Sequence, residues 1–202
     1  MKKIKKCRIC NNKNLKVVLD LGVQYLTGVF PSSKNYKISK GPLKLVKCYN
    51  NQKLKKENNC GLLQLSHDYN LDEMYGENYG YRSGLNSSMV THLNKKIKNL
   101  LKKIKLKKGD LIIDIGSNDG TTLKAYPKKK FKLVGIDPTG KKFKNYYPSY
   151  IELITDFFSM KKFKKKFGNK KAKIISSFSM FYDLDEPMNF MKDISSILSD
   201  EG

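Results

Sequence analysis

A glycine-rich turn in the second half of the chain restricts the folds that this sequence can adopt. The apolar run 111–113 leads into residues 114–120, which read Asp-Ile-Gly-Ser-Asn-Asp-Gly, and a helix-like segment follows at 121–126. A strand that breaks into such a turn before a helix is typical of α/β folds that hold nucleotide-type cofactors, because glycine allows a tight turn and the helix presents free N–H groups. Asp137 closes the next apolar run, 131–136, at about the separation used to hold a pair of ribose hydroxyls.

The rest of this half alternates strand-like and helix-like segments. Apolar runs of strand length occur at 111–115, 131–136, 151–154 and 173–177. Helix-like segments lie between and after them, at 121–126, 141–146, 160–167 and 187–198. This alternation predicts a parallel sheet covered by helices, that is, a partial α/β Rossmann-like domain over residues 109–202.

Two further zones precede the Rossmann-like part. Residues 1–68 contain all four cysteines and strand-like runs at 17–22 and 43–46, which predicts a small separate domain. Within this zone, the Lys- and Asn-rich segment 50–59 is expected to be a mobile insert. Residues 69–108 are expected to form an aromatic loop and a connecting helix.

The helix of the connecting zone is predicted from its apolar pattern. Apolar side chains recur at three- and four-residue steps between Met89 and Ile104, and lysines occupy the other face. Asn86 or Ser87 can cap the start of this helix, since short polar side chains accept hydrogen bonds from the first free N–H groups. We expect Gly109 to supply the stop.

The four cysteines indicate a metal site. Cys7 and Cys10 have the CxxC spacing of a zinc knuckle, and Cys48 and Cys60 can complete a tetrahedral set if the segment between them loops out. A closed four-cysteine site would be structural, with zinc stabilising the fold. Two unrelated thiols at Cys48 and Cys60 are the alternative, and His67 could substitute for Cys48 as a ligand.

The charge of the chain first suggests a nucleic-acid partner. There are 41 basic and 18 acidic residues, a formal net charge of +23. Arg8 and Arg82 are the only arginines, however, and the lysines are spread along the whole chain, so a solvated lysine surface is favoured and nucleic-acid binding is not expected. The sequence contains no apolar run of transmembrane length and no signal peptide, which predicts a cytoplasmic protein without a membrane partner.

The turn at 114–120 departs from the Gly-x-Gly-x-x-Gly pattern of dinucleotide sites. Asn118 takes the place of the central glycine, which it can do because asparagine tolerates a left-handed backbone. An acidic residue at the strand end with this spacing is more typical of S-adenosylmethionine sites than of NAD sites. The expected cofactor-binding residues are Asp114, Gly116, Asn118, Gly120, Asp137, Asp156 and Phe157.

Each of these residues has an expected role. Gly116 and Gly120 would clear space for the methionine and adenosine moieties, and Asp114 would orient the loop or the amino group. Asp137 would accept both ribose hydroxyls, while the Asp-Phe pair at 156–157 would face the adenine, with the aromatic ring stacking nearby. The alternative is an ordinary β-turn-α junction with solvated acids.

Several motifs, in order along the chain, resemble the S-adenosylmethionine-dependent sugar C-methyltransferases, which act on keto-deoxysugars carried by a nucleotide diphosphate. In the second half they are Asp-Ile-Gly-Ser-Asn-Asp-Gly-Thr at 114–121, Val-Gly-Ile-Asp-Pro at 134–138 and Met-Phe-Tyr-Asp-Leu at 180–184. In the first half, Cys-Arg-Ile-Cys at 7–10, Leu-Asp-Leu-Gly with Gln at 19–24 and Cys-Gly-Leu-Leu-Gln-Leu at 60–65 resemble that family's small zinc-binding domain.

The resemblance implies a substrate side as well. The segment Tyr75–Gly84 resembles the family's aromatic substrate-side loop. Tyr79 and Tyr81 could hydrogen-bond the sugar or stabilise an enolate oxygen, and Arg82 could pair with the diphosphate. The alternative for this loop is a packed hinge between domains.

Two features depart from the family pattern. Family members are usually longer, and their second half carries a His-containing motif that supplies a catalytic base. We therefore expect a chain truncated at its C-terminus, without a base of its own, and a partner chain that could supply the missing half. Cys48 and Cys60 are also separated by eleven residues, whereas the commoner pattern is a tight CxxC.

Two other functions compete with sugar C-methylation. A basic zinc-ribbon protein with a vestigial nucleotide fold would bind RNA or DNA in a strongly salt-dependent way. An RNA methyltransferase would use the same cofactor. Against it, residues 176–180 read Ser-Ser-Phe-Ser-Met, where base-methylating enzymes often carry an Asn/Asp-Pro-Pro-aromatic motif.

Overall fold

The chain forms two compact units in the computed structural model, which describes residues 1–50, 59–128 and 130–202. Unit 1 consists of Met1–Gly80 and Asp185–Met188, and unit 2 of Tyr81–Leu184 and Asn189–Gly202. The segment 50–59, expected to be a mobile insert, lies almost entirely outside the described residues. The domain limits expected at residues 68 and 108 stay predictions.

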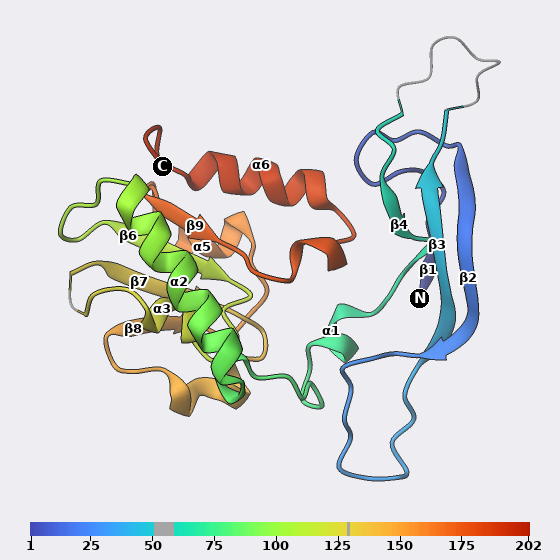
Figure 1. The fold of residues 1–202 in the computed structure, drawn as a ribbon, viewed down its shortest axis with the longest axis horizontal. Coiled ribbons are helices and arrows are strands. Elements are labelled where there is room, and N and C mark those ends of the chain that lie inside the picture. The colour runs from blue at the N-terminus through green and yellow to red at the C-terminus, as the bar shows by residue number, and fades with distance from the viewer. Residues whose placement is uncertain (51–58, 129) are drawn as a thin grey trace. The chain divides into compact units, whose positions relative to one another are not determined.

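Unit 1 is built on small antiparallel sheets (Figure 1). The strands β2 (Leu15–Tyr25), β3 (Lys40–Cys48) and β4 (Leu63–Leu65) pair in that order. A second sheet pairs β1 (Lys2–Lys3) with β5 (His67–Asp68), and the one-turn helix α1 (Leu71–Met74) follows. The strand-like runs predicted from the sequence lie inside β2 and β3.

The apolar core of unit 1 is small. Strand β2 lies at the edge of its sheet. Its exposed apolar residues, each 45–66% exposed, are Val17, Val18, Leu19, Leu21, Val23 and Tyr25. Among the described residues, the apolar side chains that unit 1 buries are Cys7, Leu26, Val29, Val46, Cys48 and Pro187. A core of this size contributes little stability, so a domain like unit 1 needs an additional cross-link.

Unit 2 contains a four-stranded parallel sheet in the order β8-β7-β6-β9. The strands are β6 (Leu111–Ile115), β7 (Lys132–Ile136), β8 (Ile151–Ile154) and β9 (Ile174–Ser176). The α-helices are α2 (Ser87–Lys103), α3 (Thr121–Lys124), α4 (Gly140–Phe143), α5 (Met160–Phe167) and α6 (Pro187–Ile197). Short 3-10 turns are η1 (Ser83–Leu85), η2 (Lys144–Tyr146) and η3 (Phe181–Asp183). The predicted α/β fold with a parallel sheet is confirmed.

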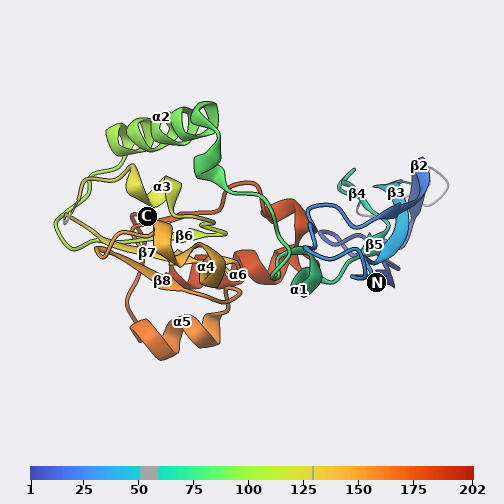
Figure 2. The ribbon, with the colours of Figure 1, turned by 90° about the horizontal axis from the view of Figure 1, so that it is seen from below.

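Helices cover both faces of this sheet (Figure 2). The core beneath α5 and α6 contains Leu111, Ile113, Ile115, Val134, Ile136, Phe163, Phe167, Ala172 and Ile197. The core beneath α2 and α3 contains Ile97, Ile112, Leu123, Tyr126, Phe131, Leu133, Ile151 and Ile174. The strand order reverses between β6 and β9, and parallel α/β sheets bind ligands at the carboxyl ends of the strands at such a point.

Helix α2 begins as predicted and ends earlier than predicted. The Asn86 side chain caps it by accepting a hydrogen bond from the Ser88 N–H. The helix ends at Lys103, so the stop expected at Gly109 is wrong. The backbone already turns extended at Ile104, and the following turn is held by a 2.7 Å bond from the Lys107 N–H to the Asp110 carboxylate. Gly109, with φ +88°, belongs to this turn before β6.

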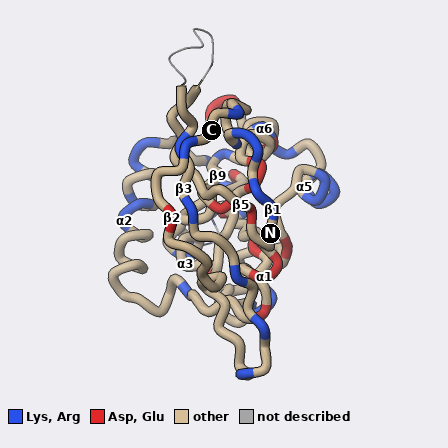
Figure 3. The backbone as a smooth tube through the Cα atoms, turned by 90° about the vertical axis from the view of Figure 1, so that its right-hand side faces the viewer, with Lys and Arg blue, Asp and Glu red and all other residues tan. Residues whose placement is uncertain are grey.

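The positive charge is spread over both units. Lysines occur on elements of both units, with β3, α2 and α5 among them (Figure 3). Among the described residues, no helix combines the length and the apolar content that a membrane span requires.

We predict that Ile97→Ala destabilises unit 2 by about 2–5 kcal/mol, because it deletes a large side chain from a packed core. Ile97 is 0% exposed and lies in the core beneath α2 and α3. Urea unfolding followed by circular dichroism measures the change. Lys96→Ala, at the adjacent exposed position, is the matched control. Equal stability of the two variants would contradict the packing described for α2.

Candidate functional site

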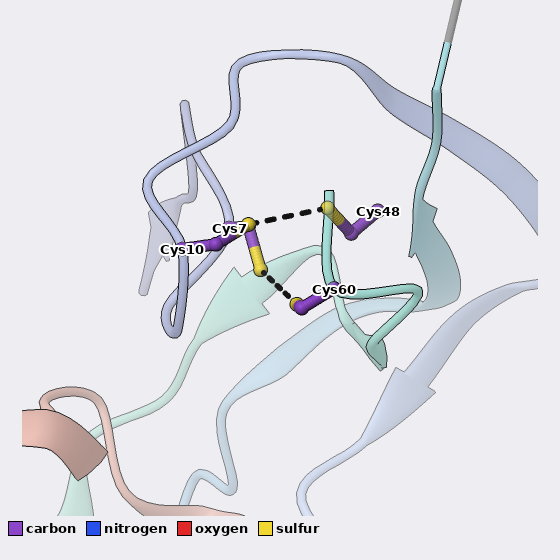
Figure 4. Close-up of side chains that lie close together, drawn as sticks. All are labelled: Cys7, Cys10, Cys48 and Cys60. Carbon is purple, nitrogen blue, oxygen red and sulfur yellow. Dashed lines mark hydrogen bonds between the residues drawn. The ribbon is translucent and has the colours of Figure 1, made fainter. Parts of the chain in front are cut away.

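Four cysteine side chains of unit 1 come together from distant parts of the sequence (Figure 4). Their Sγ atoms all lie within 4.8 Å of one another, and the Cys7–Cys60 and Cys10–Cys48 pairs are each 3.5 Å apart. Tetrahedral zinc with Zn–S bonds of about 2.3 Å would separate its sulfur ligands by about 3.8 Å. The cluster therefore has the size of a four-thiolate zinc site. His67, the alternative ligand, instead bonds the Ser66 hydroxyl through Nδ1.

The acidity of the thiols differs across this cluster. Burial works to raise the pKa of Cys7, but the backbone N–H groups of Cys10 and Ile9 and the Gln64 amide outweigh it and lower the pKa to about 6. Burial raises the pKa of Cys60 to about 12, and the neighbouring Cys7 adds to this rise. Zinc binds thiolates and releases their protons, so at neutral pH Cys7 gives up its proton to the metal more readily than Cys60.

Arg8 holds the knuckle between Cys7 and Cys10 in place. Its backbone N–H and its Nη1 both donate to the Gln64 Oε1 at 3.2 Å, and Nη1 also donates to the Leu65 carbonyl at 2.8 Å. An ion pair with Asp68 completes the set. Because these partners lie on or beside β4 and β5, Arg8 fastens the first two cysteines to the strands that follow Cys60.

In unit 2, the glycine-rich turn adopts the left-handed backbone that its composition requires. The φ angles are +73° at Gly116, +51° at Asn118 and +73° at Gly120. A Cβ atom on Gly116 would lie 3.0 Å from Met180 Cγ, and one on Gly120 would lie 2.9 Å from the Tyr147 ring. Two independent reasons therefore favour glycine at both positions: the left-handed backbone, and the side chain that packs where a Cβ atom would lie.

The Asp137 carboxylate links the ends of β6 and β7. Its Oδ2 accepts the Asn118 N–H at 2.7 Å, and its Oδ1 accepts the N–H and the hydroxyl of Thr139 at 2.7 and 2.5 Å. The residue is only 5% exposed. These bonds fix the orientation of the acid at the carboxyl end of β7, beside the turn that follows β6.

Asp114, near the end of β6, is buried, with 2% of its surface exposed. Its Oδ1 accepts the Ser176 hydroxyl at 2.6 Å. Burial raises the pKa of Asp114 to about 7, against the hydrogen bonds from Ser176 and Thr122 and with the help of the Asp137 charge. Near neutral pH this carboxyl group can therefore hold or release a proton.

Tyr147 supports the turn from the α3 side, a role that the sequence analysis missed. Its hydroxyl donates to the Asn118 carbonyl at 2.8 Å and lies 2.9 Å from the Ser117 hydroxyl. Burial raises the pKa of this phenol, so it stays protonated. Tyr147 lies 29 residues from Asn118, and no local pattern in the sequence indicates this contact.

Asp156 and Phe157 follow β8, the strand beside β7. The Asp156 carboxylate pairs with Lys162 on α5 and accepts the Phe157 N–H at 2.8 Å. The hydrogen bond from Lys162 lowers the pKa of Asp156. The structure thus places this pair at the carboxyl end of its strand, and binds the acid to α5.

The aromatic loop is divided between the units. Tyr79 belongs to unit 1, where it forms a strand-type bridge with Val29 and its ring lies 5.3 Å from that of Tyr75. Tyr81 and Arg82 belong to unit 2. The Tyr81 carbonyl accepts a hydrogen bond from the Asn118 Nδ2 at 3.1 Å. Tyr81 is 45% exposed.

Comparison with protein families defines the class of this chain. Residues 87–202 match the family described as "Methyltransferase domain", and residues 7–75 match the one described as "Putative zinc binding domain". Since the first match covers more than half of the chain, the chain belongs to the methyltransferase domain family. These two matches confirm the expected order of a zinc-binding domain followed by a methyltransferase domain.

Individual relatives add detail. The C-methyltransferase NovU of Streptomyces niveus is 27% identical over 137 residues, which are 67% of this chain and 30% of NovU. A chain of the complex containing the Haloferax volcanii Trm112 methyltransferase activator aligns with a TM-score of 0.44 and 19% identity, over 57% of this chain and 52% of that one. The CurJ carbon methyltransferase aligns with a TM-score of 0.43 and 13% identity, over 58% and 35%. The chain thus spans less than a third of NovU.

We predict that the purified protein contains about one zinc per chain, and that Cys48→Ser lowers its zinc affinity by at least about 100-fold, since a direct ligand matters more than its outer-shell partners. Metal content by mass spectrometry and competition with a chromophoric chelator measure this. Tyr49→Phe, at the next and exposed position, is the control. Unchanged zinc affinity in Cys48→Ser would remove Cys48 from the ligand set.

We predict that Asp114→Asn changes the pH dependence of folding. The pKa of Asp114 rises from its ordinary value of 3.8 to about 7 in the folded protein, so the folded state binds the proton more tightly. The contribution of this group to stability is complete below about pH 4 and is lost as the pH rises to about 7, on the order of a few kcal/mol. In the asparagine variant, the free energy of unfolding should lose this dependence on pH. Urea titrations of both proteins at pH 4.5 and 7.5 measure it, and an equal change in unfolding free energy between the two pH values would contradict the prediction.

Proposed function

We propose that this chain binds S-adenosylmethionine and forms the zinc-binding and cofactor-binding parts of a sugar C-methyltransferase. The observation that carries the proposal is the buried Asp137 carboxylate, bonded to the left-handed Asn118 at the carboxyl ends of two parallel strands. Membership of the methyltransferase domain family supports the cofactor, and similarity to NovU, a C-methyltransferase, supports transfer to carbon.

The sheet order supports one direction for the cofactor. The neighbouring strands β8, β7 and β6 are followed by Asp156, Asp137 and Gly116, respectively. Adenine near Asp156 and Phe157, ribose at Asp137 and methionine over the glycine-rich turn would follow this order. When bound, the cofactor supplies an electrophilic methyl group on a sulfonium.

Within this proposal, the residues of the chain bind and orient. Asp137 would accept the ribose hydroxyls while its Oδ2 keeps the Asn118 N–H, so one carboxylate holds both ligand and loop. Asp114 would orient the turn or accept from the amino group of the cofactor, with Ser176 fixing the position of its Oδ1. Gly116 and Gly120 keep the backbone of the turn close to the ligand.

The proposed substrate is a keto-deoxysugar linked to a nucleotide diphosphate. Its ketone acidifies the adjacent C–H, so that removal of this proton leaves an enolate whose carbon can attack the methyl group. Tyr81, which lies in unit 2 with the glycine-rich turn, is the proposed substrate-side residue, as a hydrogen-bond donor to the sugar or the enolate oxygen. The zinc would be structural, because four thiolates close its coordination.

We predict that the zinc-loaded chain binds S-adenosylhomocysteine, the demethylated cofactor, with micromolar affinity, and that Asp137→Ala weakens binding by about 10- to 100-fold. Hydrogen bonds to a charged group contribute about 1.5–3 kcal/mol, which corresponds to this range. Isothermal titration calorimetry provides the measurement.

The control is Asp110→Asn, which alters another carboxylate of unit 2 that accepts a backbone N–H. Absence of binding by the folded wild-type chain, or full binding by Asp137→Ala, would refute the cofactor assignment. Titrating the loaded protein with dTDP or UDP then tests the substrate class. Cofactor binding without any nucleotide binding would keep the methyltransferase and argue against the nucleotide sugar.

A further inference from the structure

The backbone that leads into η1 and forms its first two residues is held by side chains of the glycine-rich turn. The Asn118 Oδ1 accepts the Ser83 N–H at 2.8 Å, while its Nδ2 donates to the Tyr81 carbonyl at 3.1 Å. The Asp119 Oδ2 accepts the Gly84 N–H at 3.0 Å. Two consecutive loop side chains thus bond three backbone groups of residues 81–84, more than 30 residues away in the sequence.

Asp119 is the hub of these contacts. Its side chain is 0% exposed. One oxygen, Oδ1, accepts the N–H and the hydroxyl of Thr121 at 3.2 and 2.5 Å, at the start of α3. The other, Oδ2, accepts from Gly84 and from the Arg82 Nη1 at 3.2 Å. The two oxygens therefore have separate partners: one bonds Thr121, the first residue of α3, and the other holds the segment 81–84.

Arg82 is committed to this cluster on two sides. Besides the bond to Asp119, its guanidinium carbon lies 4.0 Å from the centre of the Tyr146 ring, within the range of a cation–π contact. Only 19% of its side chain is exposed. Gly84 leaves the room for this pairing, because a Cβ there would lie 2.4 Å from the Asp119 Oδ2. These contacts argue for a role within the protein and against the diphosphate role expected for Arg82.

Residues 81–84 lie at the point where the chain passes from unit 1 into unit 2. Gly80 is the last residue of the first stretch of unit 1, and unit 2 starts at Tyr81. The loop that holds residues 81–84 is the one whose Asn118 N–H bonds the Asp137 carboxylate. A ligand that orders Asp137 and Asn118 therefore also orders the groups that hold residues 81–84.

We propose that Asn118, Asp119 and Arg82 form a clamp on residues 81–84, and that binding of the cofactor tightens it. Arg82 and Asp119 are thus positioning residues, which couple the cofactor site to the point where the chain enters unit 2 and to the adjacent Tyr81. Such coupling is reciprocal, so loosening the clamp weakens cofactor binding to the same degree. The proposal rests on the proposed function.

The test uses Asp119→Asn in the full chain. The remaining oxygen can still accept from Thr121, but the amide nitrogen would face two donors, Gly84 N–H and Arg82, and the clamp would open. We expect the dissociation constant of S-adenosylhomocysteine to rise about tenfold, within the usual range of coupling. In the wild type, the ligand should slow amide hydrogen exchange at Ser83 and Gly84, as followed by NMR, and in the variant it should not.

Two further variants keep the test decisive. Arg82→Met removes the guanidinium but keeps an unbranched side chain, and it leaves Asp119 intact, so it serves if Asp119→Asn does not fold. Asp110→Asn removes a different carboxylate-to-backbone bond of unit 2 and should match the wild type in affinity and exchange.

The outcomes separate the clamp from the proposed function. Ligand binding by the wild type without slower exchange at Ser83 and Gly84, or with unchanged affinity in both clamp variants, would overturn the clamp and leave the cofactor assignment standing. Failure of the folded wild type to bind the ligand would refute the cofactor assignment and the coupling together. The clamp itself would then be judged without ligand, where equal exchange at Ser83 and Gly84 in wild type and Asp119→Asn would refute it.

Discussion

The hydrogen bond from the Asn118 N–H to the Asp137 carboxylate joins the turn after β6 to the end of β7, and the candidate cofactor site is built around this connection. It exists only because Asn118 accepts a left-handed backbone, which turns its N–H toward β7. In the same conformation, the Asn118 carbonyl accepts a hydrogen bond from the Tyr147 hydroxyl, and the Asn118 side chain bonds the backbone of residues 81–84. A β-branched residue at this position would be strained, and three sets of contacts would be lost together.

The two units reach stability by different means. Unit 2 buries a parallel sheet between two layers of helices, so its strands are apolar on both faces. Unit 1 has few buried apolar side chains, and two of these are cysteines. A metal bound by all four thiolates would add its binding free energy to the folding of unit 1. Cys7, with its pKa lowered to about 6, makes the first thiolate available without a strong base.

The sequence predicted the parts of the fold that depend on local pattern. Strands β6 and β8 and helix α5 occur at the predicted residues, because buried runs bounded by turns and a capped apolar pattern are visible locally. The CxxC spacing likewise identified a cluster that the structure assembles. The contacts of Tyr147 and Asp119 join residues about 30 positions apart, and no local pattern reports them. The helix ends at Lys103, where the backbone turns extended at Ile104, although the apolar pattern continues through Ile104 and Gly109 is the first glycine after it.

The net charge of the chain does not predict the electrostatic potential at the candidate cofactor site. The chain carries a net charge of +23, which on average disfavours a cofactor with a sulfonium. Exposed lysines are screened by salt over about 8–10 Å, whereas buried charges are screened much less. Asp114, Asp119 and Asp137 are all buried at the carboxyl ends of β6 and β7 or in the turn beside them, and the Asp137 charge raises the pKa of Asp114. The Asp119 charge is paired with Arg82, so the local negative potential comes from Asp137, and from Asp114 as the pH rises above about 7. This potential can attract a cation that the surface as a whole would repel.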